Sequence, residues 1–159
     1  MTIQIIDMPD DQKIQHVVAR TCVEYWQRDF PLDTDKWYLD LYQESVATNE
    51  LPIVLVALLN GEFVGTGALI TDDELPGAYE PGPWVAAVYV TDAHRQQGIG
   101  TSLVQELQRR ARTLGLTEIF LYTEYGDAWY ESMGWRSRRT AQLSGHNVTV
   151  MSCDVQATG

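Results

Sequence analysis

Hydrophobic and polar positions follow two periods along this 159-residue chain, and each period predicts a type of element. Apolar residues at helical spacing predict three helices, from Asp10 or Asp11 to about Arg28, from Asp33 or Thr34 to Ser45, and over residues 99–114. Short apolar runs predict strands over residues 2–6, 53–59, 63–70, 84–90 and 117–123. A short helix at 127–133 and two closing strands at 135–140 and 148–155 complete the expected order.

The stretch from Trp84 to Leu114 carries the first chemical signal. An almost continuous apolar run, typical of a buried strand, leads through the turn Arg95–Gly100 into an amphipathic helix. The first N–H groups of a helix lack internal partners and lie at the positive end of its dipole, so they favour an anion. Gly98 and Gly100 have no Cβ and allow a phosphate close approach, and Arg95 adds a cation.

Two common phosphate-binding patterns do not fit this turn. The P-loop pattern needs a lysine that is absent, and Leu103 stands where the dinucleotide pattern G-x-G-x-x-G needs its third glycine. What remains is R-x-x-G-x-G after a strand. This motif resembles that of the GCN5-related N-acetyltransferases (GNAT superfamily), which hold the pyrophosphate of acetyl-coenzyme A there. The chain departs from the family pattern at Asp92, often proline in relatives, and at Gln96, often glycine.

A second motif strengthens the resemblance. Residues 128–135, A-W-Y-E-S-M-G-W, are similar to the family's (F/L)-Y-E-x-x-G-(F/W) element, and the resemblance covers about residue 51 to the C-terminus. It implies one domain over residues 1–159 of the α/β (α+β) class. The expected sheet is mixed, twisted and mostly antiparallel, with about seven strands and about four flanking helices. The helix between strands 84–90 and 117–123 makes these two a parallel central pair.

The resemblance implies direct acetyl transfer from acetyl-CoA to a primary amine. Expected cofactor contacts lie along the strand and the glycine turn: Val88, Tyr89, Val90, Arg95, Gln96, Gln97, Gly98, Ile99, Gly100 and Thr101. Tyr130, the tyrosine of the second motif, is expected to supply a proton to the departing thiolate. A phenol pKa of about 10 is near enough to a thiol pKa of about 8.5 for this role.

The general base and the acceptor pocket are less defined. Glu80 is the expected base. Glu124, Asp127 and the Asp72–Glu74 cluster are alternatives, as is a water-mediated relay through Tyr89 or Tyr125. The loop over residues 71–83 is expected to be solvated, with a rim of the acceptor site as the alternative. The resemblance implies that the first two helices form a wall of the acceptor pocket with Trp26, Phe30, Trp37 and Tyr38.

The composition of the chain limits which classes of partner are expected. The net charge of −11 argues against nucleic acid. Residues 1–94 contain 4 basic and 16 acidic residues, while residues 95–159 contain 7 and 6. The acidic part either keeps the protein soluble or attracts a cationic acceptor. No metal-ligand spacing appears, and His94 and His146 are expected at surface turns.

The expected location is cytoplasmic. No apolar run reaches the ~20 residues of a membrane span, and no secretory signal is visible. Cys22 and Cys153 are expected to be reduced and buried. The expected partner is a small-molecule or peptide amine, and the protein is expected to be a monomer or homodimer. Two alternatives remain: a non-catalytic GNAT-fold module that binds acyl-CoA or a metabolite, and a transferase of another acyl group.

Overall fold

The computed structural model describes residues 2–27, 30 and 34–156. Twelve elements follow in this order: β1 (Ile3–Asp7), α1 (Gln12–Trp26), α2 (Asp35–Val46), β2 (Ile53–Leu59), β3 (Glu62–Ile70), β4 (Trp84–Val90), the 3-10 turn η1 (Asp92–His94), α3 (Ile99–Thr113), β5 (Glu118–Thr123), α4 (Asp127–Glu131), β6 (Arg136–Leu143) and β7 (His146–Asp154). Each predicted helix and strand is present.

Side chains at the helix starts explain two of the boundaries. Asp11 accepts a hydrogen bond from the Lys13 N–H at the start of α1, and Thr34 accepts one from the Trp37 N–H at the start of α2. The predicted ends were less accurate. Helix α1 ends at Trp26, and the expected end at Arg28 and the alternative start at Asp33 lie outside the described residues. The final hairpin is longer than expected, since both of its strands extend toward the turn.

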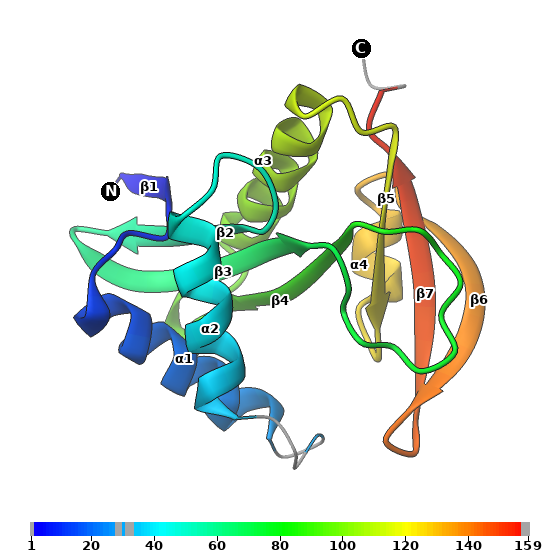
Figure 1. The fold of residues 1–159 in the computed structure, drawn as a ribbon, viewed down its shortest axis with the longest axis horizontal. Coiled ribbons are helices and arrows are strands. Elements are labelled where there is room, and N and C mark those ends of the chain that lie inside the picture. Colours follow the sequence, from blue (N-terminus) through cyan, green and yellow to red (C-terminus); the bar gives the residue numbers. More distant parts are fainter. Residues whose placement is uncertain (1, 28–29, 31–33, 157–159) are drawn as a thin grey trace.

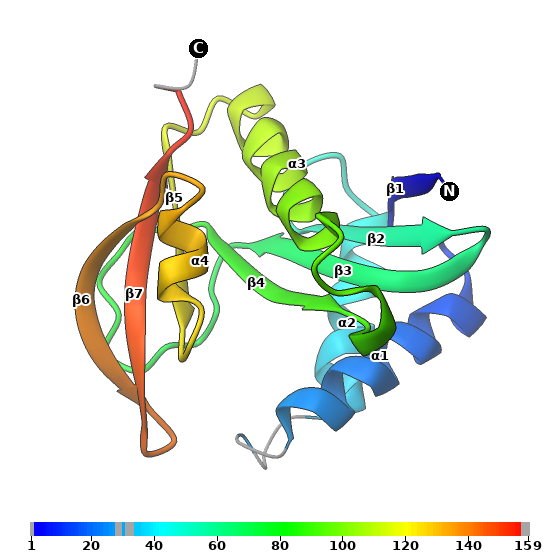
Figure 2. The same ribbon diagram turned by 180° about the vertical axis from the view of Figure 1, so that it is seen from behind.

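All seven strands form one sheet in the order β1-β2-β3-β4-β5-β7-β6. Among the strands of the described residues, β4 and β5 are the only parallel neighbours, as the sequence predicted, and the other pairs are antiparallel. Helices α1 and α2 cover one face and α3 and α4 the other (Figures 1 and 2). Two hydrophobic clusters, one on each face, join these helices to the sheet.

The parallel pair is joined at one point only. Trp84 on β4 and Phe120 on β5 are the single registered pair, and the Phe120 N–H donates to the Pro83 carbonyl at 2.9 Å. Beyond this point the two strands diverge, which splits the sheet into β1–β4 and β5–β7–β6 halves (Figure 1). The C-terminal part of β4 therefore has an open edge facing the gap.

The loop over residues 71–83 crosses from β3 to the second half of the sheet before it returns to β4 (Figure 1). Leu75 is buried, and the Tyr122 hydroxyl donates to the Asp73 carbonyl at 3.1 Å. The prediction of a solvated loop is thus only partly correct, because Asp73 is bonded to β5 and Glu80 is bonded to Arg139 of β6.

Within the described residues, no helix combines the length and the apolar character needed to cross a membrane. Cys22 and Cys153 are buried, as expected, and neither forms a disulfide within the described residues.

Candidate active site

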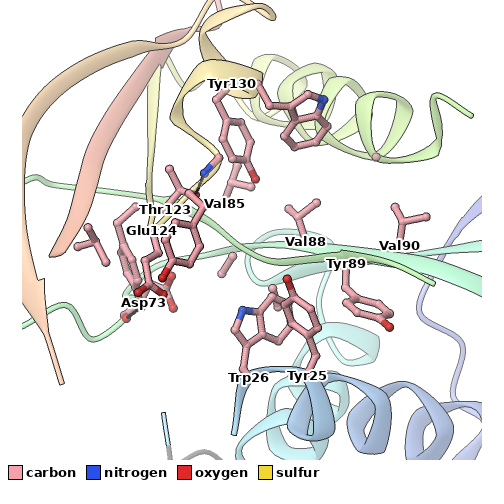
Figure 3. Close-up of a pocket in the computed structure, with 18 of the residues that line it drawn as sticks. Tyr25, Trp26, Asp73, Val85, Val88, Tyr89, Val90, Thr123, Glu124 and Tyr130 are labelled. Atoms are coloured by element: carbon pink, nitrogen blue, oxygen red, sulfur yellow. Dashed lines mark hydrogen bonds between the residues drawn. The ribbon is translucent and has the colours of Figure 1, made fainter. Parts of the chain in front are cut away.

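A cavity of about 1340 Å³ occupies the gap between β4 and β5. It is lined by residues from both helical layers and by the ends of both strands. Figure 3 shows two sides of it: Val88, Val90 and Tyr130 on the α3 side of β4, and Tyr25, Trp26 and Tyr89 on the α1 side. A ligand that enters the gap can contact both sides.

The N-terminus of α3 forms one end of this cavity. The Ser102 N–H donates to the carbonyl of the N-cap residue Gly98 at 3.0 Å, so the N–H groups before Ser102 precede the helical hydrogen bonds of α3. Gly98 adopts a φ of +82°, and a Cβ there would meet nothing within 4 Å. The turn thus exposes backbone N–H groups beside open space, as an anion site requires.

Most of the expected cofactor contacts meet at this cavity. Nine of the ten line it: Val88, Tyr89, Val90, Arg95, Gln96, Gly98, Ile99, Gly100 and Thr101. Gln97 is exposed and is absent from the lining. Arg95 has structural partners, since its Nε donates to the Val90 carbonyl at 2.8 Å and its Nη1 lies 3.0 Å from Asp92.

Strand β4 contains a β-bulge at Ala87. Thr66 on β3 opposes Tyr89, while Ala68 opposes Ala86, so β4 holds one extra residue between these pairs. Ala87 has a φ of +55°, which is uncommon for a residue with a Cβ. The bulge resets the alternation of the strand, so that Val85, Val88 and Val90 belong to the α3 side of the sheet.

Tyr130 is 8% exposed and lies at the α3 side of the cavity. Its ring packs against Trp129 and Trp135 with centroid distances of 4.8 and 5.8 Å, and its hydroxyl points into the cavity (Figure 3). Burial raises the pKa of this phenol above its ordinary value. The hydroxyl therefore stays protonated at neutral pH and can donate a hydrogen bond or proton.

Glu80 does not lie where a general base would be needed. It is absent from the cavity lining, its side chain is 7% exposed, and both of its oxygens accept hydrogen bonds from Arg139 at 2.8 Å. The Arg139 hydrogen bonds hold the pKa of this carboxyl below its ordinary value. The structure therefore argues against Glu80 as the base, because the carboxylate is already paired and lies outside the cavity.

Other carboxylates do reach the cavity. Asp73, Glu74 and Glu124 line it, whereas Asp127 does not. Glu124 follows β5 directly and has a 15% exposed side chain, with Oε1 2.7 Å from Nδ1 of His146. His146 is thus half-buried at the start of β7, not in the surface turn expected for it. Within the described chain, no group of three or more His, Cys, Asp or Glu side chains is placed to hold a metal ion.

The aromatic residues expected in the acceptor wall line the cavity, and others join them. Trp26, Phe30, Trp37 and Tyr38 all contribute. The sequence reading missed Tyr25 and Trp129, which also line the cavity. For Tyr25, the available sequence signal is its aromatic neighbour Trp26 on the same predicted helix.

With this geometry in view, the comparisons identify the family. The model described as "Acetyltransferase (GNAT) family" matches residues 18–135. The chain belongs to this family, and its fold is the GNAT fold of a seven-stranded mixed sheet with a parallel β4–β5 pair. A comparison with curated protein sequences found no significant match.

Solved structures with the same fold are only distantly similar in sequence. A GNAT-family acetyltransferase from Staphylococcus aureus Mu50 has a TM-score of 0.74 and 16% identity, over 97% of this chain and 99% of that one. An aminoglycoside 6'-N-acetyltransferase complexed with coenzyme A has a TM-score of 0.69 and 16% identity, over 98% and 97%. The PaiA N-acetyltransferase from Thermoplasma acidophilum, in complex with coenzyme A, has a TM-score of 0.69 and 16% identity, over 97% of this chain and 99% of that one. At these identities the likeness shows the fold alone.

Proposed function

We propose that this protein is an N-acetyltransferase that moves an acetyl group from acetyl-CoA to a primary amine. One observation carries the proposal: the N-terminus of α3, the open edge of β4 and the Tyr130 hydroxyl all line one cavity. The coenzyme A in two of the solved structures with this fold supports the choice of cosubstrate. Acetyl-CoA would supply an acetyl group activated as a thioester.

The residues of the turn and strand fit the two polar parts of such a cosubstrate. The backbone N–H groups from Gln96 to Thr101 would hold the pyrophosphate, because they combine open donors with the positive end of the α3 dipole. The open edge of β4 at Val88 and Val90 would pair with the amide groups of the pantetheine arm, as an added strand does.

Proton movements fall to two other groups in the cavity. In the transfer an N–C bond forms and the thioester C–S bond breaks, so the amine must lose a proton and the thiolate must gain one. Tyr130 is our proposed acid, because its buried phenol stays protonated. Glu124 replaces Glu80 as the proposed acceptor of the ammonium proton, either directly or through water, because it lines the cavity directly after the end of β5 and its side chain is only partly exposed.

Calorimetry and a thiol-release assay test the proposal together. We expect the intact chain to bind acetyl-CoA and to release free CoA thiol in the presence of a suitable amine. Binding of acetyl-CoA without release of CoA thiol across a broad amine panel would favour the non-catalytic module. Absence of acetyl-CoA binding would contradict both the enzyme and the binding-module hypotheses. Propionyl-CoA in the same assay tests the alternative of another acyl group.

A further inference from the structure

We infer that the acceptor is an arylalkylamine: one primary amine on a short chain from one aromatic ring. The inference rests on the proposed function and names the substrate class of the same site. It follows from two features of the α1 side of the cavity, its aromatic wall and the separation of its charges.

Aromatic rings from two elements form a continuous wall there. The Tyr25 and Trp26 centroids are 5.1 Å apart, and the Tyr89 ring lies 5.1 Å from Tyr25 and 6.2 Å from Trp26. Figure 3 shows these side chains together on the α1 side of β4. Trp37 and Tyr38, whose rings are 5.0 Å apart, extend the lining from α2. Edge-to-face ring pairs of this kind accept a further flat ring favourably.

Charges lie at opposite ends of this wall. The Arg95 guanidinium lies 5.6 Å from the Tyr25 ring centroid and 5.4 Å from that of Tyr89, so it closes one end. Glu124 and Asp73 lie at the other end, next to the end of β5 (Figure 3). A ligand with an ammonium group at one end and a neutral ring at the other matches this arrangement. Its ammonium group would lie toward Glu124, and its ring would lie against Trp26.

The same arrangement disfavours ligands with several cations. A linear polyamine that placed one ammonium beside Glu124 would extend its next cation along the aromatic wall toward Arg95, whose partner carboxylate Asp92 is already engaged in an ion pair. An aminoglycoside would place many hydroxyl groups against aromatic rings, and each hydroxyl buried there without a hydrogen-bond partner weakens binding. A single amine on an apolar ring has neither problem.

Thiol release with four amines tests the inference. The probes are 2-phenylethylamine, propylamine, spermidine and kanamycin, each with acetyl-CoA. We expect kcat/KM for 2-phenylethylamine to exceed each of the other three values by at least tenfold. Equal values, or a higher value for any of the other three, would overturn the arylalkylamine assignment and leave the proposed function standing. Release with none of the four and with no amine of the broad panel would instead overturn the proposed function, and the inference with it.

Two variants locate the ring and the ammonium group. We expect Trp26→Ala, or Trp26→Leu if alanine reduces folding, to raise KM for 2-phenylethylamine at least tenfold and to leave the CoA dissociation constant unchanged. Tyr79→Ala, at an exposed ring outside the cavity, is the matched control.

We expect Glu124→Gln to raise the KM for 2-phenylethylamine at least tenfold. Glu131→Gln, outside the cavity, is its control and should leave this KM unchanged. Unchanged KM in both Trp26→Ala and Glu124→Gln would overturn the inference.

Discussion

Gly100 leaves the indole of Trp129 just enough room to lie against α3. A Cβ built at position 100 would be 3.2 Å from both Cη2 and Cζ2 of Trp129, and 3.5 Å from Cγ2 of Val90. The absence of a side chain at the second glycine of the motif therefore fixes how closely the Trp129 ring packs against α3. This contact joins the two motifs, at residues 95–100 and 128–135, since Trp129 directly precedes Tyr130.

Gly100→Ala should reduce CoA binding more than it reduces stability. The added methyl group displaces Trp129, which is 39% exposed and can move, so little folding energy is lost. The displaced ring changes the cavity wall, and we expect the CoA dissociation constant to rise about tenfold, or ~1.4 kcal/mol. Calorimetry and thermal unfolding measure the two effects.

Gly115→Ala at the other end of α3 is the matched control. Gly115 has a φ of +83° and open space around its Cα, so alanine there should cost about 1–2 kcal/mol of stability without touching the cavity. We expect unchanged CoA affinity in this variant. If Gly115→Ala weakened CoA binding as much as Gly100→Ala, the loss of affinity in Gly100→Ala would come from lower overall stability and not from the displaced Trp129 ring.

The bulge in β4 should depend on a small residue at position 87. Ala87→Val places a β-branched side chain at a φ of +55°, which should destabilise the fold by about 1–3 kcal/mol and weaken CoA binding through the disturbed strand edge. Ala87→Gly relieves the backbone strain and should keep both properties near those of the native chain. Chemical denaturation and calorimetry on the pair check this, and equal CoA affinity in both variants would contradict it.

Tyr130→Phe should lower kcat about 100-fold or more, with little change in CoA affinity, because it removes a proton donor and keeps the ring packing. The raised pKa of the phenol also predicts that its deprotonation does not limit activity up to about pH 10. A pH profile of kcat measures this in the native enzyme. An unchanged kcat in Tyr130→Phe would exclude the proposed acid.

Glu80→Gln should affect stability and not catalysis. Loss of the Arg139 pair should cost about 1–3 kcal/mol at pH 7. Because the folded-state pKa of Glu80 is lowered from its ordinary 4.5, the contribution is present above that pH and is lost as pH falls through the folded-state pKa. The difference from the native chain in urea unfolding should therefore shrink below about pH 4.5.

Asp40→Asn is the control for this stability effect. Asp40 pairs with Lys36 on the surface, where the two side chains are 60% and 82% exposed. Ion pairs this exposed contribute little to the free energy of unfolding. A 100-fold lower kcat in correctly folded Glu80→Gln would return Glu80 to the role of base.

The sequence predicted those parts of the fold and the site that depend on local patterns of residues. Amphipathic spacing located α3, and Gly98, which has a φ of +82°, marked the turn directly before it. The bulge at Ala87 left no signal, since alanine is ordinary in a strand and its positive φ comes from the pairing with β3. The Glu80–Arg139 pair was equally hidden, because its partners are 59 residues apart and meet only through the loop path.

The attachment of the 71–83 loop has a consequence for how ligands enter. Among the described strands, the two halves of the sheet pair directly only at Trp84–Phe120, yet the loop bonds to Tyr122 and Arg139 on the far side. Helix α3 adds two more bonds to the second half, from Gln108 to Cys153 and from Arg112 to the Val155 carbonyl. Together these contacts set the opening angle of the cleft in advance. We therefore expect association with CoA to involve side-chain adjustment alone, without a hinge movement of one half against the other.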